Sequence, residues 1–153
     1  MFGKLSRDKT KWVIVSIILV VLLIGGVMLY KRVDDGVTTK RLSSLDYAVG
    51  SIDAATGKYS SDKTAIYTKE FLSAKDIKIE LKENSNVSYK IFYYKEDKTF
   101  ISASGALTAD YAATSNPENT KYVKIVIYNP DESEISTLGI MKYAGELKVT
   151  VEK

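Results

Sequence analysis

The sequence predicts an all-β protein, an antiparallel β-sandwich, preceded by one transmembrane α-helix. Residues 12–30, WVIVSIILVVLLIGGVMLY, form a run of nineteen residues without a charge. Several later segments alternate apolar and polar residues with the period of two that is typical of strands. Turn residues separate these segments at short intervals, and no convincing amphipathic helix follows the apolar run.

The apolar run has the length of a membrane span. At a rise of 1.5 Å per residue it would extend about 28 Å, close to the hydrocarbon core of roughly 30 Å. It is longer than the core of a signal peptide and lacks an A-x-A cleavage site, so we expect a retained anchor rather than a cleaved signal. Aromatic and basic side chains suited to the headgroup region flank the run: Lys11, Trp12, Tyr30, Lys31 and Arg32.

The orientation of this helix depends on its place in the chain. Four basic residues precede the run and four follow it within fifteen residues, so the positive-inside count is a tie. A short basic tail ahead of one span behaves as a signal-anchor, which predicts a cytoplasmic N-terminus and an extracytoplasmic C-terminus. The expected organisation is a basic tail (1–11), the helix (12–30), a juxtamembrane linker (31–45) and the β-sandwich (46–153).

Charge and composition exclude several functions. Residues 1–32 have a net charge of +5, whereas residues 33–153 carry sixteen basic and eighteen acidic residues, a net charge of −2. The outer domain therefore lacks the basic footprint of nucleic-acid binding. The chain has no Cys and no His, which removes thiol chemistry and histidine general bases. We expect neither an enzyme nor a bound cofactor or metal.

The strongest strand signals lie in six segments. DIKIELK at 76–82 and ELKVTVE at 146–152 alternate strictly, which predicts strands with one buried face. The segments at 87–94 and 122–128 are apolar on both faces and are expected to lie centrally in a sheet. Further strands are predicted at 64–72 and 99–104. The turn signals are Lys95–Lys98, Asn116–Asn119 and Asn129–Glu132.

Three segments carry a resemblance: GSIDAATGKYSSDKTAIYTKEFL (50–72), IFYYKEDKTFISAS (91–104) and NTKYVKIVIYNPDESEIS (119–136). With them, the chain resembles a small, carbohydrate-binding-like jelly-roll module of Firmicutes surface proteins and of phage tail or receptor-binding proteins. The resemblance covers about half of the chain and implies a jelly-roll sandwich without a catalytic motif. Ala65 and Lys124 stand where arginines are common in that family, so a ligand contact of those arginines is not expected here.

Tyrosines are the candidate ligand-binding residues. The outer domain has ten of them and no tryptophan. A tyrosine ring can stack on a sugar, and it also fills half-buried sheet faces, so both interpretations stay open for each residue. Tyr93 and Tyr94 are neighbours in one expected strand, so one ring should enter the core. We select Tyr94, Tyr111 and Tyr128 as the candidate exposed cluster.

The expected function is that of a membrane-anchored binding or adhesion module outside the cell. Its partners would be the lipid bilayer and either a cell-wall or host glycan or a neighbouring envelope protein. The alternative is a structural subunit of a membrane-associated assembly, such as secretion machinery or a membrane-containing virion. An envelope hydrolase ranks last because no nucleophile or acid–base signature is present. Dense Lys usage, sparse Arg and no Cys suit a low-GC Gram-positive bacterium or its phage.

Overall fold

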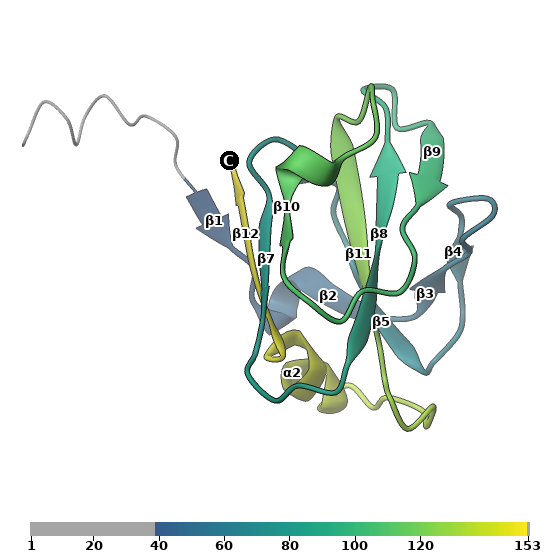
Figure 1. Ribbon diagram of the computed structural model, residues 1–153. Coiled ribbons are helices and arrows are strands. Elements are labelled where there is room, and N and C mark those ends of the chain that lie inside the picture. Colours follow the sequence, from purple (N-terminus) through teal and green to yellow (C-terminus); the bar gives the residue numbers. More distant parts are fainter. Residues whose placement is uncertain (1–38, 153) are drawn as a thin grey trace, which may run out of the picture. The chain divides into compact units, whose positions relative to one another are not determined.

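The computed structural model describes residues 39–152, which form antiparallel β-sheets with one short α-helix (Figure 1). The predicted all-β class is confirmed for this part of the chain. The predicted basic tail and transmembrane helix, with Lys11, Trp12, Tyr30, Lys31 and Arg32, lie outside the described residues. Across 39–152, no helix combines the length and the apolar character that a membrane crossing requires.

The first sheet has four strands, in the order β1-β12-β7-β10. The segments at 76–82 and 146–152 have one buried and one solvent-exposed face, as their period-two pattern predicts. Ile79 and Val149 are paired across β7 and β12 and are fully buried. Their sequence neighbours Glu80 and Lys148 are also paired, and their side chains form an ion pair on the exposed face. The strands span Thr39–Arg41 (β1), Leu147–Glu152 (β12), Lys78–Leu81 (β7) and Tyr111–Ala112 (β10).

The second sheet has the order β2-β5-β11-β8-β9, with β6 also paired to β11. The two strands predicted to be central, β8 and β11, pair over seven residues. They are buried on both faces: Ile91 and Ile125 on one, Phe92 and Val126 on the other. The strands span Tyr47–Val49 (β2), Ala65–Thr68 (β5), Tyr122–Tyr128 (β11), Ser88–Tyr94 (β8), Phe100–Ala103 (β9) and Leu72–Ser73 (β6).

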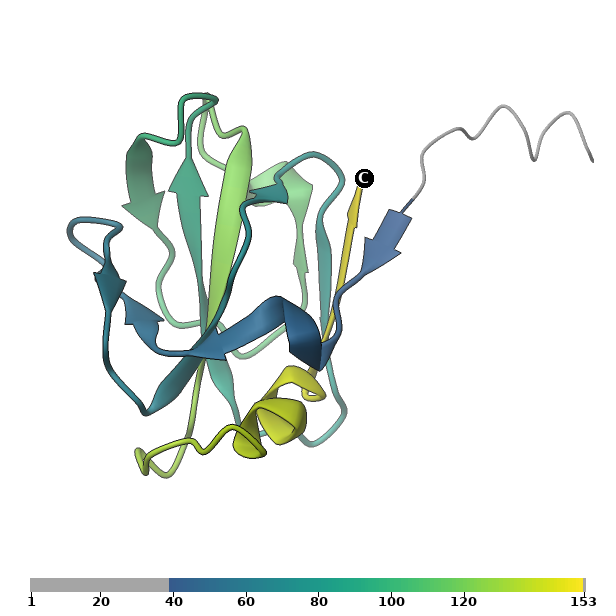
Figure 2. The same cartoon turned by 180° about the vertical axis from the view of Figure 1, so that it is seen from behind.

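Two hydrophobic cores explain this double burial. The inner core lies between the two sheets and joins residues of both, such as Ile79 and Ile125. The outer core covers the opposite face of the second sheet, where Ile52 packs with Phe92 and Val126. Ile52 belongs to a small hairpin of β3 (Ser51–Ile52) and β4 (Tyr59–Ser60), which lies on the side of the second sheet away from the first (Figures 1 and 2).

A short helix, α2 (Gly139–Ala144), lies at one end of the sandwich (Figure 1). Tyr143 and Ala144 enter the inner core, while Met141 and Lys142 stay exposed. The sequence does not predict this helix, because six residues are too few to display a helical period. Two single turns of 3₁₀ helix complete the elements, η1 (Ser44–Asp46) and η2 (Ala113–Ser115).

Several predicted boundaries are corrected. The linker predicted at 31–45 extends too far toward the C-terminus, because residues 39–41 already form β1 and pair with β12. The strand predicted at 64–72 is interrupted after Thr68 and resumes as β6. The hairpin turn at Lys95–Lys98 and the turn at Asn129–Glu132 are confirmed by backbone hydrogen bonds between their end residues, 3.0 and 3.1 Å long.

Candidate functional site

Tyr94 is a core residue and not part of an exposed cluster. Its side chain is only 3% exposed, which overturns the predicted exposure. The hydroxyl donates a hydrogen bond of 3.0 Å to the carbonyl oxygen of Gly57 in the β3–β4 hairpin. Its neighbour Tyr93 points into the inner core, so the predicted alternation of the two rings is confirmed. Tyr93 is buried between the two sheets, and the β3–β4 hairpin covers the opposite face of the second sheet, where Tyr94 lies.

Tyr111 lies in the other sheet, on β10, and packs half-buried against the inner core. Its hydroxyl lies 3.1 Å from the hydroxyl of Tyr93 and donates a hydrogen bond of 2.6 Å to Oδ1 of Asn116. These bonds join the two sheets, so the ring serves the fold. The structure therefore does not bring Tyr111 together with Tyr94 or with Tyr128.

Tyr128 is the predicted tyrosine that lines a surface hollow. It ends β11 on the outer face of the second sheet, where it is paired with Ser88 on β8 and Ala65 on β5. Its ring is half-buried and forms one wall of a hollow of about 550 Å³. We call this the Tyr128 hollow; its lining is Asp62, Thr64, Ser88, Lys90, Ala106, Tyr128, Asn129, Pro130 and Glu132.

Internal hydrogen bonds fix the rim of the Tyr128 hollow. The backbone N–H of Asn129 donates to the carbonyl of Thr64 at 2.9 Å, and its side-chain amide donates to the Ser133 carbonyl and hydroxyl oxygens, both at 2.9 Å. The Asp62 carboxylate accepts bonds from the Thr64 backbone N–H and hydroxyl at 2.9 and 2.8 Å. Such side-chain-to-backbone bonds stabilise turns, so both loops hold a defined shape.

The hollow carries charges of both signs beside an aromatic ring. The ammonium nitrogen of Lys90 lies 5.6 Å from the centroid of the Tyr128 ring. Within residues 39–152, neither Lys90 nor the carboxylates of Asp62 and Glu132 take part in an ion pair. Burial raises the pKa of Tyr128; a hydrogen bond with Ser51 opposes this shift and the charge of Asp62 adds to it. The phenol therefore stays protonated at neutral pH.

This combination suits a ligand that has an apolar face and many hydroxyl groups. A flat ring offers an apolar surface, and ammonium, carboxylate and hydroxyl groups offer donors and acceptors around it. The volume also falls within the roughly 300–1,000 Å³ of typical small-molecule sites. Because the rim is held by its own hydrogen bonds, a ligand would meet a largely formed surface.

Sequence reasoning missed Lys90 and Asp62 as members of this hollow. Lys90 precedes Phe92 by two residues, so alternation alone places it on the same sheet face. Only the register that sets Ser88 opposite Tyr128 shows that Lys90 approaches that ring. Asp62 reaches the hollow through its turn with Thr64, and a lone Asp-x-Thr in a loop gives no such signal.

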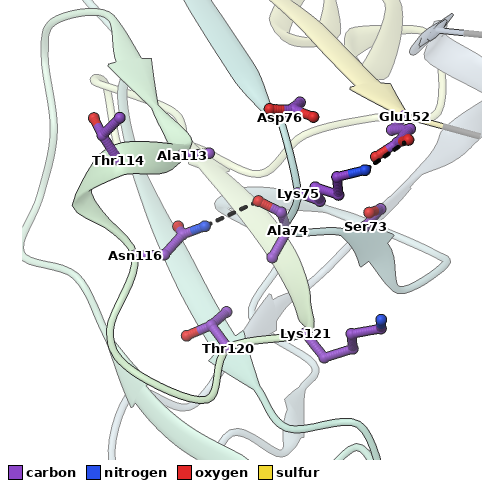
Figure 3. Close-up of a pocket in the computed structure, with 10 residues that line it drawn as sticks. All are labelled: Ser73, Ala74, Lys75, Asp76, Ala113, Thr114, Asn116, Thr120, Lys121 and Glu152. Atoms are coloured by element: carbon purple, nitrogen blue, oxygen red, sulfur yellow. Dashed lines mark hydrogen bonds and ion pairs between the residues drawn. The ribbon is translucent and has the colours of Figure 1, made fainter. Parts of the chain in front are cut away.

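A second hollow, of about 660 Å³, opens beside β6, η2 and the end of β12 (Figure 3). Much of its polar chemistry is already internally paired. The Asn116 amide donates to the Ala74 carbonyl at 2.9 Å, and Lys75 forms an ion pair with Glu152 at 3.2 Å. Its lining is Ser73, Ala74, Lys75, Asp76, Ala113, Thr114, Asn116, Thr120, Lys121 and Glu152. With no aromatic ring in its lining, it is the weaker candidate for a sugar site.

No family model matches the chain, and no curated protein or solved structure matches it either. The resemblance to jelly-roll modules therefore depends on the three sequence segments at 50–72, 91–104 and 119–136 alone. Any function assigned to the protein has to come from the chemistry of its own residues.

Proposed function

We propose that residues 39–152 form a non-enzymatic, jelly-roll-like binding module that holds a glycan in the Tyr128 hollow. The single observation that carries this proposal is the half-buried Tyr128 ring, set in a preformed hollow among Asp62, Lys90 and Glu132. A sugar presents an apolar CH face to such a ring and hydroxyl groups to the charged rim. The resemblance to carbohydrate-binding-like modules supports the same class of ligand.

The proposed location is the outer surface of a membrane. The uncharged run at 12–30 has the length and flanking residues of a span, and a long domain after a single signal-anchor can translocate largely regardless of its charge. In this arrangement the anchor keeps the module close to the bilayer, where it would meet cell-wall or host glycans. A protease added to intact protoplasts is expected to degrade the module, whereas full protection would reverse the proposed orientation.

A structural role in a membrane-associated assembly is the second candidate, and one observation favours it. The elements α2 and η1 contact each other. Three large apolar side chains on or beside them are exposed: Leu45 (81%), Leu138 (82%) and Met141 (66%). Apolar side chains that gather on one surface can mark a contact with another protein. The occupant would then be an envelope protein rather than a glycan.

The test is a binding screen with the full chain in a detergent that lacks a sugar headgroup. The chain is applied to an array of bacterial cell-wall and host glycans, and positive glycans are then titrated by calorimetry. Tyr128→Ala should weaken binding at least tenfold, because it removes the wall of the hollow. Tyr59→Ala, which removes an exposed tyrosine outside the hollow, should leave affinity unchanged.

Two results would reject the glycan proposal. One is the absence of binding to any glycan at millimolar concentration. The other is equal affinity for the Tyr128→Ala variant and the parent chain. Tight co-purification of an envelope protein from membranes, lost when Leu138 and Met141 are replaced by Ser, would establish the structural role in its place.

A further inference from the structure

A second cluster on the outer face of the second sheet gathers two cations over one ring. Phe71, between β5 and β6, contacts Tyr94 and Tyr122 edge-on, with ring centroids 4.9 and 6.2 Å apart. The ammonium nitrogen of Lys124 lies 4.6 Å from the Phe71 centroid, and that of Lys98 lies 5.1 Å from it. Both fall within the roughly 6 Å range of a cation–π contact. We call Phe71, Lys98 and Lys124 the Phe71 site.

The Phe71 site is separate from the Tyr128 hollow. Lys124 and Tyr128 share one face of β11, and four residues of a strand place their Cα atoms about 13 Å apart. Val126 lies between them on that face and is fully buried in the outer core with Ile52 of the hairpin. A ligand could therefore reach the sheet on either side of the hairpin, and the two places can be altered independently.

The Phe71 site holds two positive charges close together, although like charges repel each other. Among residues 39–152, neither Lys98 nor Lys124 forms an ion pair with a carboxylate. Burial lowers the pKa of Lys124; the nearby charge of Glu70 opposes this shift and that of Lys98 adds to it. Two ammonium groups that share one ring without a paired carboxylate would both be stabilised by an added anion.

Lys98, whose side chain carries one of these charges, has an unusual backbone conformation. Lys98 has φ of +65°, a left-handed conformation that Gly and Asn adopt readily and that is uncommon for other residues. Its N–H donates to the Lys95 carbonyl at 3.0 Å, and Lys95 N–H donates to the Thr99 carbonyl at 2.9 Å. Glycine would fit this turn better, so the turn itself does not require the Lys98 side chain.

We propose that the Phe71 site binds an anionic group, a phosphate or a carboxylate, carried on the glycan that the module recognises. This inference rests on the proposed glycan-binding function and narrows its ligand to an acidic polysaccharide. Phe71 brings the two ammonium groups together over one ring, and both can approach the acid that the sugar carries. Lys124 gives one hydrogen to the Lys69 carbonyl at 2.9 Å, so others remain for the ligand.

The experiment measures binding of the full chain, in detergent without a sugar headgroup, to matched polymers. The probes are poly(glycerol phosphate), polygalacturonate, fully methyl-esterified polygalacturonate and inorganic phosphate. We expect at least one of the two acidic polymers to bind at least tenfold more tightly than the methyl ester, with affinity that falls as salt rises. Methyl esters and acids that bind equally would overturn the proposal.

Two variants test the residues. Lys98→Gly removes one ammonium group and relieves the left-handed backbone, so binding to the acidic polymer should fall at least fivefold while the melting temperature rises. Lys124→Met keeps an apolar stem over Phe71 without the charge and should weaken binding at least fivefold. The control is Lys95→Gln, a charge loss in the same turn at a residue without a cation–π contact, which should change affinity less than twofold.

The failure of this inference differs from the failure of the proposed function. If Lys98→Gly and Lys124→Met bind glycans as the parent chain does while Tyr128→Ala does not, the anion site is rejected and glycan binding stands. If neither these polymers nor any glycan of the array binds, the proposed function fails as well; if only array glycans bind, the anion site alone is rejected. Inorganic phosphate that displaces the acidic polymer at equal phosphate concentration would reject recognition of a polymer, because it would reduce the site to one for a free anion.

Discussion

The hydroxyl oxygens of Tyr93 and Tyr111 lie 3.1 Å apart and connect the two sheets of the sandwich. Tyr93 comes from β8 in the second sheet and Tyr111 from β10 in the first. The connection continues through Asn116, which accepts a bond from Tyr111 at 2.6 Å and donates one to the Ala74 carbonyl at 2.9 Å. Four chain segments therefore share one row of hydrogen bonds at this end of the inner core.

Removal of the Tyr111 hydroxyl should destabilise the fold. Tyr111→Phe keeps the ring but removes the partner of the Tyr93 hydroxyl and of Asn116 Oδ1, which we expect to cost about 1–2 kcal/mol of unfolding free energy. Urea unfolding followed by circular dichroism measures the loss. Because Tyr93 and Tyr111 share one bond, the double Phe variant should lose less than the sum of the two single variants. Strict additivity would contradict a shared network.

Tyr47→Phe should have the opposite outcome. Its hydroxyl is buried and has no hydrogen-bond partner among the described residues, and burial raises the pKa of this phenol, with the charge of Asp46 acting in the same direction. An unpaired buried hydroxyl costs about 1 kcal/mol or more, so its removal should leave stability unchanged or raise it. This variant is matched to Tyr111→Phe in chemistry, and a clear loss of stability would show that Tyr47 has an unseen partner.

Acid should weaken the first sheet through Glu80. Hydrogen bonds from Lys148 and Lys78 lower the pKa of Glu80 from 4.5 to about 2. Because its folded pKa lies below the unfolded value, its contribution to stability is present above pH 4.5 and is lost as the pH falls toward 2. Between pH 5 and pH 2.5 the urea midpoint of the parent chain should fall more than that of Glu80→Gln. The difference should shrink in high salt, because the group is exposed.

Gly57→Ala should loosen the β3–β4 hairpin. Gly57 has φ of +67°, and a Cβ atom there would lie 2.4 Å from the Phe100 ring. We expect a loss of about 1–3 kcal/mol, since both the backbone conformation and the space oppose a side chain. Gly105→Ala is the control, because a Cβ atom at that position meets no atom within 4 Å. Equal urea midpoints for the two variants would contradict this account.

Local patterns were sufficient to predict the strands of both sheets that carry most of the core. The strict alternation around Ile79 and Val149 predicted one buried face, and the apolar residues on both faces around Phe92 and Val126 predicted central strands. What local patterns could not reveal is the cover on the second face. The β3–β4 hairpin around Ile52 is short and polar, so its sequence does not predict that it buries Tyr94.

The candidate sites were harder to predict because they join distant residues. Tyr128 could be selected as an aromatic residue near a turn, but its neighbour Lys90 follows only from strand register. Lys124 was noticeable as a departure from an expected arginine, whereas its convergence with Lys98 on Phe71 depends on tertiary packing. The polar strand β1 also escaped, since its three residues form a strand only beside β12.

The pairing of β1 with β12 has a mechanical consequence. Tension applied at Thr39 would reach the sandwich through three residue pairs, of which Thr39 with Glu152 is the first, followed by the hydrogen bond from the Leu42 N–H to the Val149 carbonyl. In an antiparallel pair of strands pulled from one end, such contacts break one after another. The three residues of β1 would then release about 10 Å of chain before the load reached the core. Under tension at Thr39, β1 would therefore detach from β12 before the core of the sandwich bears the load.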